Sequence, residues 1–244
     1  ARHNRKQIVL IDKGAHPRAD GIPRVNPQAI EEDLSESLER LGTDYIDLYL
    51  LHRDDPDYPV GPIVECLHAQ REAGRIRAYG GSNWTHRRIQ DANEYAARHG
   101  LWGFVASSPY FGLAVQNEPP WPGCIALDKE GWKWHWAQQF PLLPWSSQAG
   151  GFFTGRYSPQ IHDNPTVERV YYSEANWERL RRARELGRAK NATANQIALA
   201  YVLQQPFPVF PLIGPRSPAE LNDSLGALEV SLTSQEMRWL NLES

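Results

Sequence analysis

The pattern of apolar and polar positions along the chain predicts short buried strands that alternate with helices. Six short apolar runs have the length and the β-branched or aromatic content of buried strands. They cover Ile8–Ile11, Ile46–Leu51, Arg77–Gly80, Phe104–Ser108, Leu142–Trp145 and Val209–Ile213. Because helical patterns separate these runs, we expect a parallel sheet whose strands are joined by helical crossovers.

The segments between the runs carry signals for helix starts and ends. Asn26 and Pro27 suit the N-cap and the first helical position, and Gly42 is a typical helix end. Ser217–Glu220 has the form of a capping box with proline at the first helical position. Further helices are expected to begin near Pro62, Thr85, Ser173, Thr193 and Thr233.

A long stretch without clear periodicity lies between Pro109 and Pro141 and is rich in proline, glycine and tryptophan. Irregular segments of this length are usually functional. Trp121 lies in this stretch, and an aromatic platform packs well against the face of a sugar. We therefore predict Trp121 as a substrate-binding residue for a sugar-like carbonyl compound. The alternative is that these tryptophans cover the mouth of a barrel or an interface.

Two architectures fit alternating strands and helices: a (β/α)₈ barrel and an open, doubly wound sheet. No predicted strand ends in a Gly-x-Gly-x-x-Gly turn, which disfavours the dinucleotide-binding open sheet. Distinctive residues lie at or just past the strand ends, and a barrel gathers all such ends on one face. They are Lys13, His52, Ser82, Asn83, Ser108, Trp145 and Arg216. The sequence thus predicts a TIM barrel that forms a single domain over residues 1–244.

Composition narrows the class of protein without identifying it. Of the 244 residues, 41% are hydrophobic and 23% are charged, as in an ordinary globular protein. A net charge of -3 gives no sign of nucleic-acid or membrane affinity. The two cysteines favour a reducing compartment, so we predict a cytoplasmic protein. The histidines show no metal-binding spacing, so no metal site is expected and a metal-dependent barrel hydrolase is disfavoured.

The segment Asp47–Asp55, with the helix and Gly42 before it, closely resembles a signature of the aldo-keto reductases. The resemblance continues in order along nearly the whole chain. It implies a (β/α)₈ barrel that binds NADPH across its mouth and reduces aldehydes or ketones by hydride transfer. It also implies a catalytic tetrad of aspartate, tyrosine, lysine and histidine, in which tyrosine protonates the developing alkoxide.

By position, Lys13 resembles the tetrad lysine and His52 the tetrad histidine. Asp12 stands where the family usually has threonine or serine, and a carboxylate beside the ammonium would raise the lysine pKa. Ser82 and Asn83 resemble the motif that holds the nicotinamide carboxamide. Ser108 stands where the family commonly has a glutamine that also binds the carboxamide, so the resemblance assigns Ser108 to the cofactor site with a shorter side chain.

The resemblance assigns the rest of the cofactor site to two later segments. Trp145 stands where an aromatic ring stacks on the nicotinamide. The remaining assignments are Ser146, Gln148 and Gly150 along the pyrophosphate, Arg216 and Ser217 at the 2′-phosphate, and Asp223 and Ser224 near the adenine. An arginine at a helix N-terminus suits a phosphate, so the resemblance implies NADPH in preference to NADH.

The family has two further βα units before the lysine strand, and these carry the tetrad aspartate and tyrosine. About seven residues precede Ile8 here, and six strands cannot close an eight-stranded barrel. We therefore expect an N-terminally incomplete barrel, completed by a missing N-terminal segment or a partner chain, with impaired turnover. The alternative is a catalytically inactive nucleotide-binding protein that regulates a partner on the same scaffold.

Overall fold

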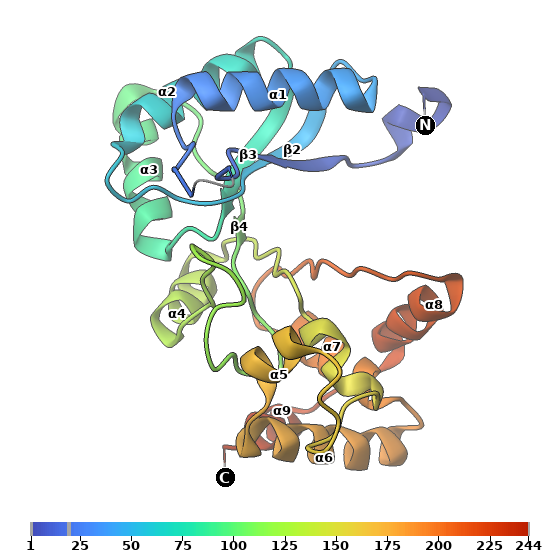
Figure 1. The fold of residues 1–244 in the computed structure, drawn as a ribbon. Helices are drawn as coiled ribbons and strands as arrows, with labels where there is room; N and C mark the ends of the chain where they lie inside the picture. Colours follow the sequence, from blue (N-terminus) through green and yellow to red (C-terminus); the bar gives the residue numbers. More distant parts are fainter. Residues whose placement is uncertain (1, 19–20, 244) are drawn as a thin grey trace. The chain divides into compact units, whose positions relative to one another are not determined.

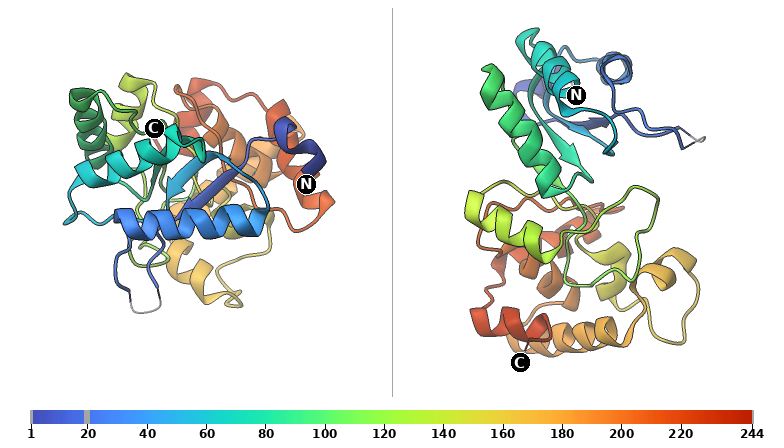
Figure 2. Two further views of the ribbon diagram at one scale, coloured as in Figure 1. Left: turned by 90° about the horizontal axis from the view of Figure 1, so that it is seen from above. Right: turned by 90° about the vertical axis from the view of Figure 1, so that its left-hand side faces the viewer.

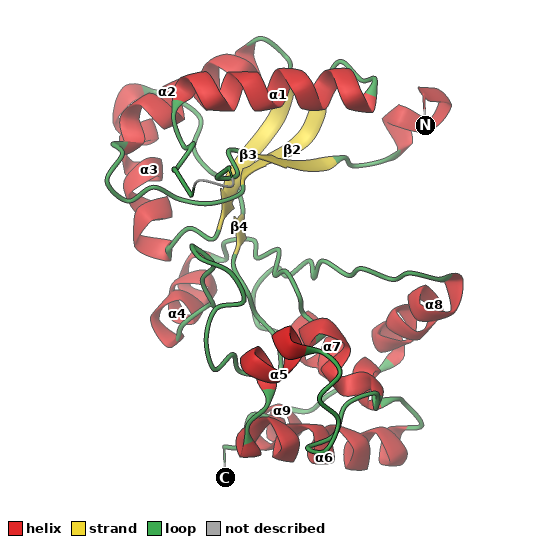
Figure 3. Cartoon of the chain, viewed as in Figure 1, coloured by secondary structure: helices red, strands yellow, loops and turns green. Residues whose placement is uncertain are grey.

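The computed structural model describes residues 2–18 and 21–243 and divides into two compact units. Unit 1 comprises residues 1–108 and 133–140, and unit 2 comprises residues 109–132 and 141–244. Within the described residues, the regular strands all belong to unit 1, whereas unit 2 consists of helices and loops (Figure 3). The single domain over residues 1–244 expected from the sequence stays a prediction.

Unit 1 contains a parallel sheet in the order β1-β2-β3-β4. Its strands are β1 (Ile11–Gly14), β2 (Ile46–Leu51), β3 (Ile76–Ser82) and β4 (Ser107–Ser108). The connecting helices are α1 (Pro27–Leu41), α2 (Val60–Glu72) and α3 (His86–His99), and a 3₁₀ helix, η1 (Arg2–Gln7), precedes β1. The three α-helices cover one face of the sheet (Figure 1, Figure 2). This is the predicted parallel sheet with helical crossovers.

The core of unit 1 lies between the sheet and these helices. Tyr49 and Tyr79 point from the central strands toward the helices, where Ile30, Leu34 and Ile63 pack against the same cluster. Successive residues of a strand point to opposite faces. The residues that alternate with the tyrosines therefore belong to the other face, which carries Lys13 and the polar group described below.

The predicted helix ends are confirmed where a cap residue was recognised. The side chain of Asn26 accepts a hydrogen bond from the backbone of Ala29 at 3.0 Å, and Pro27 opens α1. Gly42 ends α1 with φ 60°, a left-handed conformation that glycine adopts without steric cost. The caps of α3, α6, α7 and α8 also sit where the sequence placed them, at Thr85, Ser173, Thr193 and Ser217.

Unit 2 is built from helices around one apolar cluster. They are η2 (Ala149–Thr154), α5 (Pro165–Tyr171), α6 (Glu174–Lys190), α7 (Ala194–Leu203), α8 (Pro218–Gly226), η3 (Ala227–Glu229) and α9 (Ser234–Leu240). Phe152 and Phe153 from η2 pack with Leu180 of α6 and Ile197 of α7. A further helix, α4 (Lys129–Gln138), begins in unit 2 and ends in unit 1. No helix among residues 2–18 and 21–243 is long and apolar enough to cross a membrane.

The first, third and fourth predicted strands differ in their bounds from those observed. The first begins at Ile11, not Ile8, because pairing starts where Ile11 meets Leu48. Lys13 therefore lies within the strand and not beyond its end. The third strand continues to Ser82, and the fourth shortens to Ser107–Ser108.

The fifth and sixth runs do not form regular strands in the described residues. Leu142 and Val209 form a single parallel bridge, extended by the bond from the Leu212 amide to the Pro144 carbonyl at 2.9 Å. Pro141 and Pro208 directly precede the two runs, and Pro144 and Pro211 interrupt them. Each proline lacks the amide donor that a ladder needs. The six regular strands expected from the sequence are therefore not found, although the two runs do lie side by side.

Two α-helices of the described residues were not predicted from the sequence. α4 lies in the segment interpreted as irregular, and α5 lies before the cap at Ser173. In α4, tryptophan at positions 132, 134 and 136 gives a period of two and obscures the helical period. The start of α4 did carry a local signal, because the Asp128 carboxylate accepts a hydrogen bond from the Gly131 amide at 2.6 Å.

Candidate functional site

A polar group gathers at the carboxyl ends of the strands in unit 1. The Lys13 ammonium lies 3.2 Å from Ser82 Oγ and 3.5 Å from Ser108 Oγ. Ser82 Oγ donates in turn to the Ser108 carbonyl at 2.9 Å. Both serines are fully buried. Strands β1, β3 and β4 therefore each supply one member of a preformed cationic centre.

The side chain of Asp12 belongs to the opposite face of the sheet from Lys13. The pKa of Tyr49 is raised by burial first, and then by the nearby carboxylates of Asp33 and Asp12. Asp12 thus extends toward the helix-covered face, as strand alternation requires. The expectation that Asp12 raises the lysine pKa has no geometric support in this arrangement.

His52 follows the last residue of β2 and belongs to the same end of the sheet. Its amide donates to the Gly14 carbonyl at 2.8 Å, and its ring stands edge-on to that of His16, with centroids 4.7 Å apart. Burial lowers the pKa of His52 to about 4, and the nearby side chains of Lys13, His16 and Arg53 lower it further. The imidazole is therefore neutral at pH 7 and is able to both donate and accept a hydrogen bond.

Asn83 joins this group through both backbone and side chain. It adopts φ 60°, its amide donates to the Ser108 carbonyl at 3.1 Å, and its Nδ2 donates to the His52 carbonyl at 3.0 Å. The structure thus brings together Lys13, His52, Ser82, Asn83 and Ser108. The contact between Ser108 and Lys13 was not predicted, because nothing in the local sequence links residues so far apart.

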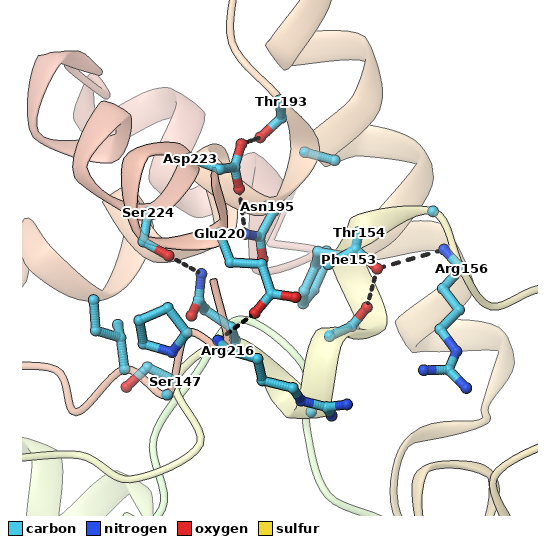
Figure 4. A pocket seen from close by; sticks show the side chains of 18 of the residues that line it. Ser147, Phe153, Thr154, Arg156, Thr193, Asn195, Arg216, Glu220, Asp223 and Ser224 are labelled. Atoms are coloured by element: carbon cyan, nitrogen blue, oxygen red, sulfur yellow. Dashed lines mark hydrogen bonds between the residues drawn. The ribbon is translucent and has the colours of Figure 1, made fainter. Parts of the chain in front are cut away.

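Unit 2 contains a pocket of about 950 Å³ formed by the segment around η2, the start of α7 and the loop into α8 (Figure 4). Six of the predicted cofactor residues line it: Ser146, Gln148, Gly150, Arg216, Asp223 and Ser224. Trp145 and Ser217 are not among its described lining residues. Trp145 is partly buried against Tyr110, with ring centroids 5.4 Å apart, and Ser217 Oγ caps α8 by accepting from the Glu220 amide at 3.2 Å.

Hydrogen bonds of Asp223 and Ser224 connect the segments that line the pocket. The Asp223 carboxylate accepts from Thr193 Oγ1 at 3.0 Å and from Asn195 Nδ2 at 2.7 Å. Gln148 Nε2 donates to Ser224 Oγ at 3.1 Å. Asp223 therefore ties α8 to the start of α7, and Ser224, where the family often has asparagine, still supplies a polar group inside the pocket.

Exposed arginines line the mouth of the pocket. Arg216, Arg156 and Arg184 are exposed lining residues (Figure 4), and the Arg156 guanidinium pairs with the Asp163 carboxylate at 3.1 Å. Glu220 does not pair with the Arg216 guanidinium in the contacts observed; its carboxylate accepts from the Arg216 amide at 2.6 Å. Arg156 and Arg184 were not predicted from the sequence as pocket residues. The available sequence signal for Arg156 was the Thr154–Gly155–Arg156 turn, which follows Gly150 and Gly151.

Trp121 lies in unit 2 on a closed loop. The two ends of the loop are joined at Tyr110. The Tyr110 amide donates to the Ile125 carbonyl at 2.9 Å, and the Tyr110 carbonyl accepts from the Leu127 amide at 2.8 Å. Trp121 is 57% exposed. It is not among the described lining residues of the pocket, and its role as a substrate-binding residue stays a prediction.

These features define a class: an α/β protein with a parallel sheet, a cationic, histidine-bearing centre at the strand ends and an arginine-lined pocket. Residues 1–241 match the Aldo/keto reductase family model, and the chain belongs to that family. It is 29% identical over 245 residues to the aldo-keto reductase yakc (NADP(+)) of Schizosaccharomyces pombe, covering 96% of this chain and 68% of that protein.

Further comparisons agree with this family. The uncharacterized oxidoreductase YrpG of Bacillus subtilis is 27% identical over 243 residues, which is 97% of this chain and 72% of that protein. A crystal structure of a thermostable aldo-keto reductase with the inhibitor epalrestat superposes with a TM-score of 0.72 at 21% identity, covering 98% of this chain and 72% of the other. Across six curated relatives, the chain spans 59–72% of the relative's length.

Proposed function

We propose that this protein is an NADP(H)-dependent oxidoreductase that reduces an aldehyde or ketone. The observation that carries the proposal is the arginine-lined pocket of unit 2, which has the charge and the donors that a dinucleotide phosphate needs. Gly150 and Gly151 line it with φ 61° and 86°, so the backbone leaves room for a ligand to approach closely. Membership of the aldo/keto reductase family supports the same activity.

In this proposal, Arg216 binds the 2′-phosphate at the N-terminus of α8, and the segment from Ser146 to Gly150 follows the pyrophosphate. Asp223 and Ser224 lie toward the adenine, and Trp145 stacks on the nicotinamide. Ser82 and Asn83 hold the carboxamide. NADPH, when bound, supplies the hydride.

Lys13 and His52 carry the polar chemistry at the carbonyl. A neutral His52 orients the carbonyl oxygen by donating a hydrogen bond, which its lowered pKa permits at pH 7. The Lys13 ammonium stabilises negative charge that develops on that oxygen. Trp121 is proposed as an apolar platform for a sugar-like substrate. The expectation that further βα units carry a tetrad aspartate and tyrosine stays a prediction.

Titration of the protein with NADPH and with NADH tests the cofactor assignment. Arg216→Ala should weaken NADPH binding by roughly ten-fold to a hundred-fold, because a charge-assisted hydrogen bond is worth about 1.5–3 kcal/mol, and should change NADH binding little. The matched control is Arg188→Ala, an exposed arginine of α6 outside the described pocket lining. Equal losses for both nucleotides would show that Arg216 does not recognise the 2′-phosphate.

Oxidation of NADPH with a reactive aldehyde then tests turnover. Tight NADPH binding without turnover, under conditions where the aldehyde is in excess, would overturn the reductase assignment for this chain. It would favour a nucleotide-binding protein on the same scaffold.

A further inference from the structure

The loop that follows β2, residues 52–58, is held by side chains from one later segment of unit 1. Asn83 Nδ2 donates to the His52 carbonyl at 3.0 Å, and Trp84 Nε1 donates to the Arg53 carbonyl at 2.9 Å. Arg88 Nη2 donates to the Asp55 carbonyl at 2.9 Å and also to the Tyr58 carbonyl. Four carbonyls of the loop therefore accept hydrogen bonds from residues 83–88.

Arg88 makes the largest share of these contacts. Besides the two carbonyls, its Nε lies 3.2 Å from one oxygen of the Asp54 carboxylate and 3.3 Å from the other. Its guanidinium also lies over the Trp84 ring, 5.2 Å from the centroid. The side chains of Arg88 and Asp54 are only 14% and 9% exposed. The Arg88 guanidinium thus binds Asp54, Asp55 and Tyr58 of the loop. It also packs on the Trp84 ring, and Trp84 binds the Arg53 carbonyl.

The place of Arg88 in the fold makes this arrangement rigid. It lies in the first turn of α3, and the Thr85 side chain caps that helix by accepting from the Arg88 amide at 3.2 Å. The preceding residues, Ser82 and Asn83, belong to the end of β3 and to the polar group around Lys13. The same short segment therefore connects the site, the loop and the helix start.

We propose that Arg88 is a positioning residue that fixes the 52–58 loop and so sets the place of the His52 imidazole. The expected effect on catalysis rests on the proposed function, whereas the effect of Arg88 on the position of His52 does not. Arg88 itself does not touch the reacting atoms in this assignment. Its forked donors order a loop that would otherwise expose several carbonyls, and the histidine moves with that loop.

Loss of the guanidinium should alter the surroundings of His52 in a measurable way. Burial is the main cause of the low pKa of His52, so a looser loop that admits water should move that pKa upward. We expect Arg88→Ala to raise the pKa of His52 by about one unit. If the proposed reductase activity holds, kcat should fall by about 10- to 100-fold with little change in NADPH affinity, because misplacement of a catalytic group affects chemistry more than cofactor binding.

The test is NMR titration of the histidine ring signals in the absence of nucleotide. His52→Gln identifies the His52 signal, since the chain has eight histidines. Arg87→Ala is the matched control, because Arg87 is the exposed neighbour of Arg88 on the same helix. The expected result is an upward shift for Arg88→Ala and none for Arg87→Ala. An unchanged His52 titration in folded Arg88→Ala protein would overturn the proposal.

A second variant decides the matter if Arg88→Ala does not fold. Arg88→Lys keeps a positive charge near Asp54, but one ammonium cannot replace the fork that binds Asp54 and both carbonyls. The proposal expects Arg88→Lys to shift the His52 titration upward as well, and a titration identical to that of the wild type would overturn it. Because the signal requires neither cofactor nor substrate, an absence of turnover in the wild type would count against the reductase assignment alone.

Discussion

Two partly buried residues near the start of the 52–58 loop, His52 and Asp54, have pKa values displaced in opposite directions. Burial lowers the pKa of His52 from 6.5 to about 4, so its contribution to stability is fully present above pH 6.5 and is lost as pH falls through 4. Burial also raises the pKa of Asp54 from 3.8 to about 6, although Arg88 opposes the shift. The Asp54 contribution is thus present below pH 3.8 and is lost as pH rises through 6.

These opposite signs predict that the two groups offset each other between about pH 4 and pH 6. Compared with the wild type, the free energy of unfolding of Asp54→Asn should rise with pH across this window. The reason is that the pH-dependent contribution of His52 is then no longer offset by that of Asp54. That of His52→Gln should fall with pH. Each difference should be on the order of 3 kcal/mol over the full window. Urea unfolding at several pH values measures it, and three parallel curves would contradict the assignment of these pKa shifts.

At this scale, the candidate site was predictable where a residue lies at a strand end with a recognisable neighbourhood. His52, Ser82 and Asn83 met that condition, Lys13 lies one residue before the end of β1, and the structure places the four together. The role of Arg88 was not predictable, because its partners in the loop lie 30–34 residues earlier in the chain. Local pattern carries no signal for such a contact.

Among the elements of unit 2, the loop that bears Trp121 is anchored to α6 by one buried amide. Asn176 is fully buried, and its Nδ2 donates to the Val115 carbonyl at 2.7 Å and to the Tyr171 carbonyl at 2.8 Å. Its Oδ1 accepts from the Val115 amide at 2.9 Å. The Asn176 side chain thus pairs with the Val115 backbone as a neighbouring strand would, and it ties this part of the loop to the start of α6.

Asn176→Ala should therefore destabilise unit 2 and loosen this loop. The change leaves buried backbone groups of Val115 and Tyr171 without their partner, and the expected loss is on the order of 3 kcal/mol. Asn222→Ala on the exposed side of α8 is the control, and it should change the free energy of unfolding by less than about 0.5 kcal/mol. Urea unfolding and limited proteolysis near residues 113–120 measure the effect. Equal stabilities of the two variants would show that the loop does not depend on this amide.

The helices were more predictable than the strands for a physical reason. A cap such as Asn26 is satisfied by an amide three residues away, so its signal is local and can be read from the sequence. A strand depends on a partner that is distant in the chain, and prolines 144 and 211 interrupt the last two runs. Apolar content alone therefore overestimated the number of strands.

At the scale of the whole molecule, β1 forms one edge of the sheet. Ile8, Val9 and Ile11 at or before this edge are 47%, 75% and 37% exposed. An exposed apolar edge favours pairing with another chain. Unmodified protein should therefore associate with itself as its concentration rises.

Val9→Lys should reduce this association, because a charged side chain at a sheet edge disfavours pairing. Val115→Lys provides the control, since Val115 is 54% exposed on a loop of unit 2. Size-exclusion chromatography with light scattering over a range of concentrations measures the average mass. If both variants match the wild type at every concentration, the β1 edge does not drive association.

The path of the chain through the two units has a consequence for synthesis on the ribosome. The chain leaves unit 1 after Ser108, passes through residues 109–132 of unit 2, and returns for residues 133–140. Trp134 and Phe140 of the returning segment pack on the apolar cluster of unit 1. At 5–20 residues per second, the ribosome needs about 2–6 s to translate from residue 108 to residue 140. During that interval the nascent sheet and its three helices lack these aromatic side chains, so part of the apolar cluster of unit 1 is exposed. A chaperone that binds apolar surface should therefore bind the nascent chain most strongly in this interval.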